Sequence, residues 1–396
     1  MKYLILGAGP AGLTFANYLM SHGERSFLIL EKEKEAGGLC RSVNVDDSPL
    51  DIGGGHFLDV RDGETTAFLF QFMPENEWNR FRRNSQIHIH DTFINSPIEA
   101  NIWQLPLDEQ VEYLKSIAVA GCNLGIPQPE KFIHWINWKL GDRIADRYMI
   151  PYNVKVFSKS LDELGTYWLD KLPNVSFDQT LMSCLERKAY GTQPGHTEFL
   201  YPRKYGYGEL WLRMGDKIKN NIQYNVNVSE FDFTKNEING TFKADCIIST
   251  IPWREFSVLK GMPEELQLKI RELKHSSISV EYFNKNMETD AHWIYYPDMD
   301  LSYHRILIRH NFCNGAKGCW TETNLERTDK STNMNKFINK YAYPLNTIKK
   351  PVIMQEILNW IKTKNIYGLG RWGEHQHYNS DVTVKLSINL AKKLLI

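Results

Sequence analysis

The chain has 396 residues, enough for two or three domains and for a large core that needs neither disulfides nor metal. Lys and Arg together number 47, as do Asp and Glu, so net charge gives no support for binding nucleic acid or an anionic membrane surface. The six cysteines lack the spacing of a zinc site, and the apolar stretch before the first glycines is too short for a signal peptide or a membrane span. We therefore expect a cytoplasmic protein with reduced thiols and a small-molecule partner.

The chain opens with the pattern of a nucleotide-binding βαβ unit. Periodicity predicts a strand, a helix and a second strand, at residues 2–6, 11–21 and 26–30. Gly7, Gly9 and Gly12 fall between strand and helix, where the backbone can approach a pyrophosphate at the helix N-terminus. Glu31 follows the second strand, where a carboxylate can accept from ribose hydroxyls. The pattern predicts dinucleotide binding; the alternative is a tight glycine-rich turn without a ligand.

The next segments alternate between helix and strand. We predict a helix at 64–74 and one strand at 86–94 that carries His88 and His90 on one face. Metal binding would need a third ligand nearby, so a solvated strand face is favoured. Helical periodicity at 109–120 and 129–146 predicts a helical insertion.

The second half of the chain returns to strands. We predict a glycine-rich turn, a helix and a strand at 202–208, 209–219 and 243–250, and antiparallel strands at 279–283, 293–296, 305–310 and 319–323. The chain ends with a helix, a strand and a helix at 352–362, 366–369 and 381–395. The prediction is an α/β fold with a discontinuous Rossmann-like domain (1–70, 196–255, 345–396), a helical insertion (106–165) and an antiparallel substrate-facing sheet (71–105, 166–195, 256–344).

Three motifs resemble markers of the amine oxidase and protoporphyrinogen oxidase-like flavoproteins. Glu31 is followed by Gly37-Gly38 and Arg41, the strand 244–250 runs into Ile251-Pro252, and Gly370-Arg371 precedes an acid at a helix start. The resemblance implies FAD, rather than NAD, in the dinucleotide site, with the glycines and Arg41 beside its phosphates. The implied FAD-binding residues are Gly7, Gly9, Pro10, Ala11, Gly12, Glu31, Lys32, Gly38, Leu39, Arg41, Gly54, His56, Val226, Gly370, Arg371 and Asp381.

The middle of the chain is similar to the UDP-galactopyranose mutases. The similar stretches are 151–157 (PYNVKVF), 293–297 (WIYYP) with Tyr303-His304-Arg305, Gly54-Gly55-His56, 199–202 (FLYP) and Tyr343-Pro344. The resemblance implies substrate contacts from Asn153, Phe157, Lys171, Trp293, Tyr295, Arg305 and Tyr343, and catalytic roles for His56, Arg305, Tyr343 and Tyr378. An arginine fork suits a diphosphate, and this role falls to Arg305. The alternatives are an arginine paired with a carboxylate such as Asp300, tyrosines that pack in the core, and a structural histidine.

The implied function is an isomerase that interconverts the pyranose and furanose forms of a nucleotide-diphosphate sugar for surface-glycan and polysaccharide precursor synthesis. N5 of reduced FAD would attack the anomeric carbon, with NAD(P)H as external reductant and no metal. The implied partner is the nucleotide-sugar, without nucleic acid or membrane, and homo-oligomer formation is left open.

Three positions depart from the mutase pattern. Ser96-Pro97-Ile98-Glu99 replaces a uridine-facing segment of aromatic, Pro and Gln character, and Lys171 stands where a second diphosphate-binding arginine is expected. The C-terminal tyrosine of the family falls at His377 or Tyr378. These departures predict another sugar or base, such as a deoxy- or amino-sugar linked to dTDP or UDP. An FAD-dependent oxidase or dehydrogenase of the amine oxidase class and a flavin-binding scaffold without catalysis are the alternatives.

Overall fold

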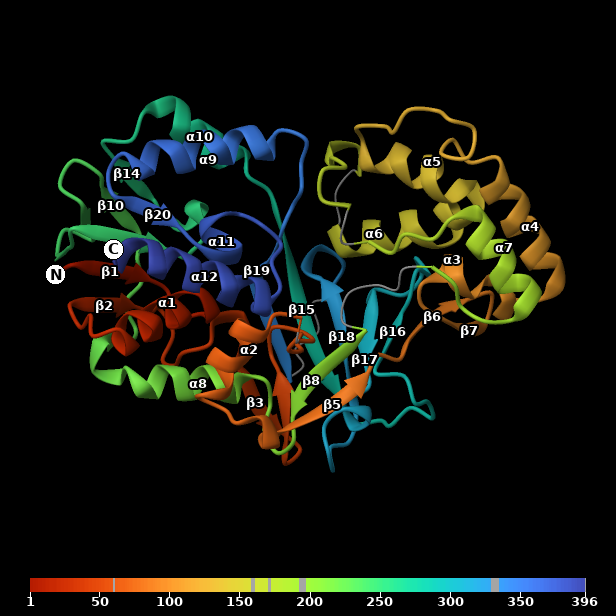
Figure 1. The fold of residues 1–396 in the computed structure, drawn as a ribbon, viewed down its shortest axis with the longest axis horizontal. Coiled ribbons are helices and arrows are strands. Elements are labelled where there is room, and N and C mark those ends of the chain that lie inside the picture. Colours follow the sequence, from red (N-terminus) through yellow and green to blue (C-terminus); the bar gives the residue numbers. More distant parts are fainter. Residues whose placement is uncertain (60, 158–160, 170–171, 192–196, 329–334, 396) are drawn as a thin grey trace.

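The computed structural model describes residues 1–59, 61–157, 161–169, 172–191, 197–328 and 335–395. It has the predicted α/β class, and Figure 1 shows a region that holds both termini, a central sheet and a helical lobe on the far side of that sheet. In the described part of the chain, no helix combines the length and apolar character needed to cross a membrane.

A five-stranded parallel sheet forms the centre of the region with the termini. Its order is β20 (Ile366–Gly368), β13 (Cys246–Ser249), β1 (Tyr3–Leu6), β2 (Phe27–Leu30) and β9 (Ile222–Gln223). All four residues of β1 are buried, because a parallel sheet is covered on both faces. Tyr3 and Ile5 belong to one hydrophobic core, and Leu4 and Leu6 to another. The predicted βαβ start is confirmed.

Helices cover both faces of this sheet. The first core includes residues of α1 (Pro10–Ser21), α8 (Gly208–Lys217), α12 (Ser380–Leu395) and α2 (Gly63–Phe70). The second includes α9 (Glu264–Glu272), α10 (Lys350–Lys362) and a small sheet of β12 (Phe242–Lys243), β11 (Glu237–Ile238), β10 (Glu230–Asp232) and β14 (Val258–Lys260). The short helix α11 (Gly370–Gly373) follows β20. Because the helices and the small sheet cover the two faces of the parallel sheet, its strand ends are what remains for a ligand, and in such folds ligands bind at the carboxyl ends.

The central sheet has seven strands. Its order is β19 (Lys336–Pro344), β15 (His275–Phe283), β18 (Cys319–Asn324), β17 (Arg305–Leu307), β16 (Trp293–Tyr295), β6 (Ser85–Ile89) and β7 (Thr92–Asn95). The four strands predicted between 279 and 323 are present, but β16 pairs with β6 in parallel, so the sheet is mixed. Two ribbons complete the region: β5 (Trp78–Arg82) with β8 (Glu198–Pro202), and β3 (Ser42–Val45) with β4 (Ser48–Asp51).

The single strand predicted at 86–94 is wrong. The chain reverses at His90-Asp91, where φ is 50° and 54°, and forms the hairpin β6–β7. His90 Nε2 lies 3.0 Å from Tyr113 Oη, whereas the His88 ring lies 4.9 Å from that of Phe93. Among the described residues, no three His, Cys, Asp or Glu side chains are grouped to hold a metal.

The helical lobe contains α3 (Ile98–Asn101), α4 (Leu107–Ala118), α5 (Phe132–Ile144), α6 (Ile150–Phe157) and α7 (Phe177–Glu186). The helix predicted at 129–146 is longer than expected, because a π-helical turn at Ala145–Met149 joins α5 to α6. Inside α5, Gly141 has a φ of 74°, and a Cβ there would lie 2.4 Å from Ser116 O. Tyr295 of β16, which the sequence predicted to contact the substrate, packs against both the sheet core and the lobe core and so lies where the two meet.

Candidate functional site

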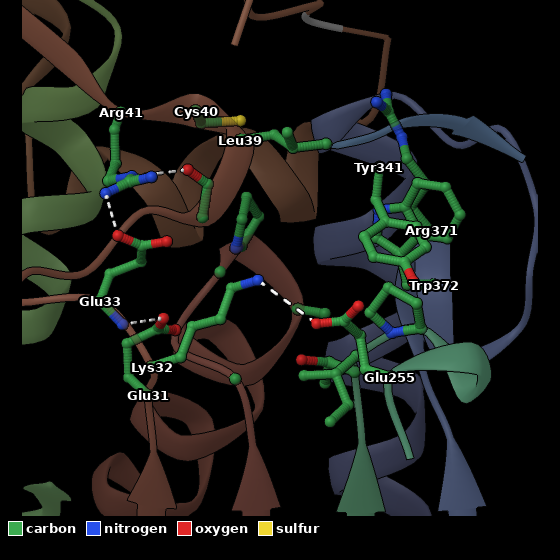
Figure 2. A pocket seen from close by; sticks show the side chains of 18 of the residues that line it. Glu31, Lys32, Glu33, Leu39, Cys40, Arg41, Glu255, Tyr341, Arg371 and Trp372 are labelled. Atoms are coloured by element: carbon green, nitrogen blue, oxygen red, sulfur yellow. Dashed lines mark hydrogen bonds and ion pairs between the residues drawn. The ribbon is translucent and has the colours of Figure 1, made fainter. Parts of the chain in front are cut away.

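A cavity of about 310 Å³ lies at the carboxyl ends of β1, β2 and β13 (Figure 2). Of the residues expected at FAD, it is lined by Gly7, Gly9, Pro10, Ala11, Glu31, Lys32, Gly38, Leu39, Arg41, His56, Val226 and Arg371. Tyr378, expected at the substrate, also lines it, but Gly12, Gly54, Gly370 and Asp381 are not in the lining.

The glycines after β1 bring the backbone close to neighbouring segments. Gly7 has a φ of 102°, and a Cβ there would lie 2.6 Å from Thr250 Oγ1. A Cβ on Gly12 would lie 2.1 Å from Gly7 O, so Gly12 packs α1 against the strand rather than facing the cavity. In the described chain no side chain caps α1, whose N-cap is Gly9. The first-turn amides and the helix dipole therefore favour an anion at this end.

The acidic residue after β2 is held by backbone amides. Ala8 N donates to Glu31 Oε2 over 2.7 Å, and Glu33 N donates to Oε1 over 2.9 Å. Burial raises the pKa of Glu31, while these amides act in the opposite direction. Each oxygen keeps a further lone pair that can accept from a ligand hydroxyl. Arg41 is fixed by bonds to Gly38 O (3.0 Å) and Glu33 Oε2 (3.2 Å).

Arg371, on α11, is held by carbonyl oxygens. Its Nη1 donates to Ala342 O over 3.1 Å, and Nη2 donates to Tyr378 O over 2.9 Å. Burial lowers its pKa. In the described part of the chain, no carboxylate lies within 4.0 Å of its guanidinium, so the positive charge is available to an anionic or electron-rich ligand.

Lys32, which the sequence predicted, lies in the cavity lining with two residues that the sequence did not predict, Glu255 and Lys340. Lys32 Nζ lies 3.7 Å from Glu255 Oε2, and Lys340 Nζ lies 2.9 Å from the other oxygen of Glu255. Figure 2 shows Lys32 and Glu255 reaching toward each other from opposite walls. Both lysines are more than half exposed, so these pairs stabilise the fold little.

His56 is one of the residues that line the cavity. Its Nδ1 is 3.0 Å from Gly54 O, and because a carbonyl can only accept, Nδ1 carries the proton. Burial lowers the pKa of His56 to about 4, helped by the nearby charge of Arg371. The ring is therefore neutral at pH 7, and Nε2 is a bare acceptor.

Glu322 connects the His56 loop to Arg305 on β17. Its Oε1 accepts from Gly55 N over 2.7 Å, and its Oε2 accepts from Arg305 Nε over 3.0 Å. Burial raises the pKa of Glu322, but this effect is outweighed by the charge of Arg305, the His304 ring and the Gly55 amide. Together they lower the pKa to about 2. Glu322 is thus ionised, and the carboxylate partner of Arg305 is this buried group rather than Asp300.

The expected substrate tyrosines gather around Arg305. The Tyr295 ring lies 5.3 Å from that of Tyr152, a neighbour of Asn153 on α6. Burial lowers the pKa of Arg305, but Glu322, Tyr343, Tyr152 and Tyr295 more than offset this effect and raise it overall. Burial also raises the pKa of Tyr343, and Glu322 adds to the rise. The predicted residues His56, Arg305, Tyr295 and Tyr343 thus form one electrostatically linked group.

The other predicted substrate residues are placed less directly. Asn153 is buried, and its Nδ2 donates to Met149 O over 2.7 Å, while Phe157 packs at the end of α6. Trp293 packs in the sheet core. Lys171 lies outside the described residues. At the C-terminal position, Tyr378 lines the cavity and the His377 ring lies 5.0 Å from that of Tyr343.

Two further cations near these residues were missed. Arg83 Nη2 donates to Tyr295 Oη over 3.3 Å. Lys155 is fully buried, and its Nζ donates to Tyr296 O over 2.8 Å. Lys155 lies within the mutase-like stretch 151–157, which was a signal for a role near the substrate. It was missed because a lysine in a helix is usually solvated. Arg83 had no signal beyond its place before a strand.

The first part of the chain matches a known family model. The model of the NAD(P)-binding Rossmann-like domain covers residues 5–72. An uncharacterized protein in the nifH2 3' region of Methanothermococcus thermolithotrophicus is 34% identical over 107 residues, which are 26% of this chain and 98% of that protein. The chain belongs to the same family as that protein.

Solved structures match the whole chain. A reduced UDP-galactopyranose mutase superposes with a TM-score of 0.87 at 20% identity, covering 100% of this chain and 93% of the other. A putative protoporphyrinogen oxidase from Exiguobacterium sp. 255-15 gives 0.72 at 13% identity (99% and 98% covered), and a CLA-producing fatty acid isomerase from P. acnes gives 0.66 at 14% (100% and 99%). The resemblance predicted from the motifs is therefore confirmed at the level of the fold.

Proposed function

We propose that the protein is a flavin-dependent isomerase that interconverts the pyranose and furanose forms of a nucleotide-diphosphate sugar, in surface-glycan precursor synthesis. The observation that carries the proposal is the position of Glu322, which binds Arg305 on one side and the loop of His56 on the other. One carboxylate thereby joins the arginine proposed for the diphosphate to the loop of His56, which lines the dinucleotide cavity. The full-length similarity to UDP-galactopyranose mutase supports the same function.

The proposed cofactor is FAD. The uncapped start of α1 and Arg41 suit its pyrophosphate, and Glu31 suits a ribose. Gly7 leaves no room for a side chain, as a close ligand requires. Arg371 and His56 would lie toward the ring system. When bound and reduced, FAD supplies a nucleophilic nitrogen to this site. The proposed reductant is NAD(P)H.

The side chains would bind, orient and exclude water. Arg305 keeps Nη1 for a phosphoryl oxygen while Glu322 fixes its plane. The hydroxyls of Tyr295 and Tyr343 can donate to the sugar or the diphosphate, and neutral Nε2 of His56 can accept a proton in a hydrogen bond. The rings of Tyr148, Tyr152 and Tyr295 form a largely buried wall that limits water around the reacting centre.

The proposed base is not restricted to uracil. Glu99, in the segment that departs from the mutase pattern, is buried on α3, and burial raises its pKa to about 7. A carboxyl group that is partly protonated at neutral pH can accept from or donate to a base edge, whereas aromatic and amide groups would stack on and read uracil. A deoxy- or amino-hexose linked to dTDP or UDP remains the proposed substrate class.

The test is incubation of the dithionite-reduced protein with UDP-, dTDP- and GDP-hexopyranoses, followed by chromatography and mass measurement. We expect a furanose isomer of unchanged mass that forms only with reduced flavin and is lost in Arg305→Ala. Isomerisation by the oxidised protein, or none with any sugar, would count against the proposal. Loss of flavin colour when the oxidised protein meets an amine or alcohol would instead favour the oxidase alternative.

A further inference from the structure

The turn between β16 and β17 is tied to the helical lobe by a buried lysine. Tyr295 of β16 pairs with Arg305 of β17, and the chain turns back between them. Lys155 of α6 is fully buried and reaches this turn. Its Nζ donates to Tyr296 O over 2.8 Å and to Asp298 O over 2.5 Å. One side chain of the lobe therefore holds two carbonyl groups of the turn that begins directly after Tyr295.

The same face of α6 contacts the hairpin nearer to its paired residues. Tyr152 lies three residues before Lys155, about one helical turn, so the two side chains leave the helix on the same side. The centroid of the Tyr152 ring lies 5.3 Å from that of Tyr295 and 6.0 Å from that of His304. Figure 1 shows α6 on the side of the lobe that faces β15 and β18. The helix thus contacts the hairpin at two points, through a ring beside Tyr295 and through an ammonium group at the turn.

A second polar contact fixes the end of α6 to the strand that carries Glu322. Asn324 of β18 is buried, and its Nδ2 donates over 2.8 Å to the carbonyl oxygen of Val156, the residue after Lys155. Asn324 and Glu322 are two positions apart, so their side chains extend from the same face of β18. Glu322 binds Arg305 on β17. The end of α6 is therefore tied both to the turn that follows β16 and to the strand that fixes Arg305.

Lys155 contributes orientation to this junction more than stability. Burial lowers its pKa to about 8, and the charge of Arg327 acts in the same direction while Asp298 opposes it, so burying the ammonium group costs free energy. The two carbonyls and the Tyr303 ring, whose centroid lies 5.8 Å from Nζ, offset part of this cost. A methionine would fill a similar space without burying a charge. What the lysine adds is a fixed direction for the two carbonyls of the turn.

We propose that Lys155 and Asn324 are positioning residues of the substrate site, which hold α6 in a fixed place against the β16–β17 hairpin. The proposal rests on the proposed function, in which Tyr295 and Arg305 contact the nucleotide-sugar. Arg305 is bound by Glu322 within the sheet, so loss of the α6 contacts leaves the diphosphate-binding group in place. What changes is the fit of the lobe around the sugar, and a misplacement of about 1 Å at a reacting centre can slow a reaction about a hundredfold.

The test is steady-state kinetics of the full-length, flavin-loaded and reduced protein with UDP-, dTDP- and GDP-hexopyranoses, using the sugar that the wild type isomerises fastest. In Lys155→Met we expect kcat to fall about tenfold or more, while KM changes less than about threefold. Lys155→Arg, which keeps a charge and N–H donors, should recover part of the loss. Flavin content should stay at the wild-type level, because α6 and the turn after Tyr295 do not line the dinucleotide cavity. Lys285→Met, at an exposed position, is the control and should match the wild type.

The outcomes separate this inference from the proposed function. A wild-type kcat in Lys155→Met would overturn the inference and leave the proposed function standing. A loss of flavin in step with the loss of activity would also overturn it, since this indicates general damage to the fold. If the wild type isomerises none of the sugars, both are wrong. Should Lys155→Met not fold, Asn324→Asp decides by the same changes in kcat and KM, because it keeps the acceptor for Glu326 N and removes the donor to Val156 O.

Discussion

Arg305 and Glu322 lie opposite each other on β17 and β18, with Nε of the arginine 3.0 Å from Oε2 of the glutamate. The glutamate side chain has no exposed surface, whereas the arginine side chain retains 17%. The pair is therefore anchored at its acidic end and presents its basic end to the site. Because the other glutamate oxygen binds Gly55 N, a change at Glu322 acts on both the arginine and the neighbouring loop.

Glu322→Gln should destabilise the protein and weaken the substrate site. It leaves the guanidinium without its charge partner, which costs about 3 kcal/mol when a buried pair is broken. Urea unfolding at pH 7 measures the loss. The control is Glu198→Gln, where a side chain that is 57% exposed pairs with Arg80 on the surface, and the expected cost is below about 1 kcal/mol. Equal costs for the two variants would show that the buried pair contributes no more than a surface one.

His56 should make the fold sensitive to mild acid. Its pKa is about 4 in the folded protein against 6.5 for an ordinary histidine, so between these values the unfolded chain holds a proton that the folded one does not. The free energy of unfolding therefore falls as pH drops from about 6.5 to about 4, by up to about 3 kcal/mol from this residue. Guanidinium unfolding at pH 7 and pH 5 should show a smaller difference in His56→Gln than in the wild type. The exposed-site variant His22→Gln should keep the wild-type difference.

Lys155 should make the free energy of unfolding depend on pH in the alkaline range. Burial lowers its pKa from 10.5 to about 8, so between these values the unfolded lysine is protonated and the folded one is not. The free energy of unfolding of the wild type, relative to Lys155→Met, should therefore rise with pH from about 8 to about 10.5, by up to about 3 kcal/mol. Lys285→Met, at an exposed position, should show no such trend. A flat difference for Lys155→Met would mean that the amine is protonated throughout.

The dinucleotide cavity could be predicted because its signals are local. The strand, Gly7, the helix start and Glu31 lie within about 30 residues of one another, and each follows from periodicity or spacing. The turn at His90-Asp91 could not be predicted, since it contains no glycine and the alternation of 86–94 continues through it. The chain reverses because His90 and Asp91 both adopt a positive φ, which the sequence pattern does not show.

The partners of the residues predicted to face the substrate could not be predicted from the sequence. Gly55 and Glu322 are 267 positions apart, and Arg83 and Tyr295 are 212 apart. Strand alternation does not show that β18 is buried at five of its six positions, so that its acid must find an internal partner. The motif at 293–305 indicated an arginine that faces the substrate but gave no sign that a carboxylate neutralises it.

Gly7→Ala should remove the cofactor while leaving most of the fold intact. A Cβ at this position would lie 2.6 Å from Thr250 Oγ1, which belongs to the lining of the cavity. The alanine would also have to adopt a φ of 102°. Gly23→Ala is the matched control, because its φ is 86° but no atom lies within 4 Å of the added carbon. Both variants should lose about 1 kcal/mol of unfolding free energy from the backbone conformation. Only Gly7→Ala should purify with little flavin, measured as the ratio of flavin to protein absorbance, since it alone narrows the approach of a pyrophosphate to the start of α1. Wild-type flavin content in Gly7→Ala, or equal loss in both variants, would show that the turn after β1 does not contact the ligand.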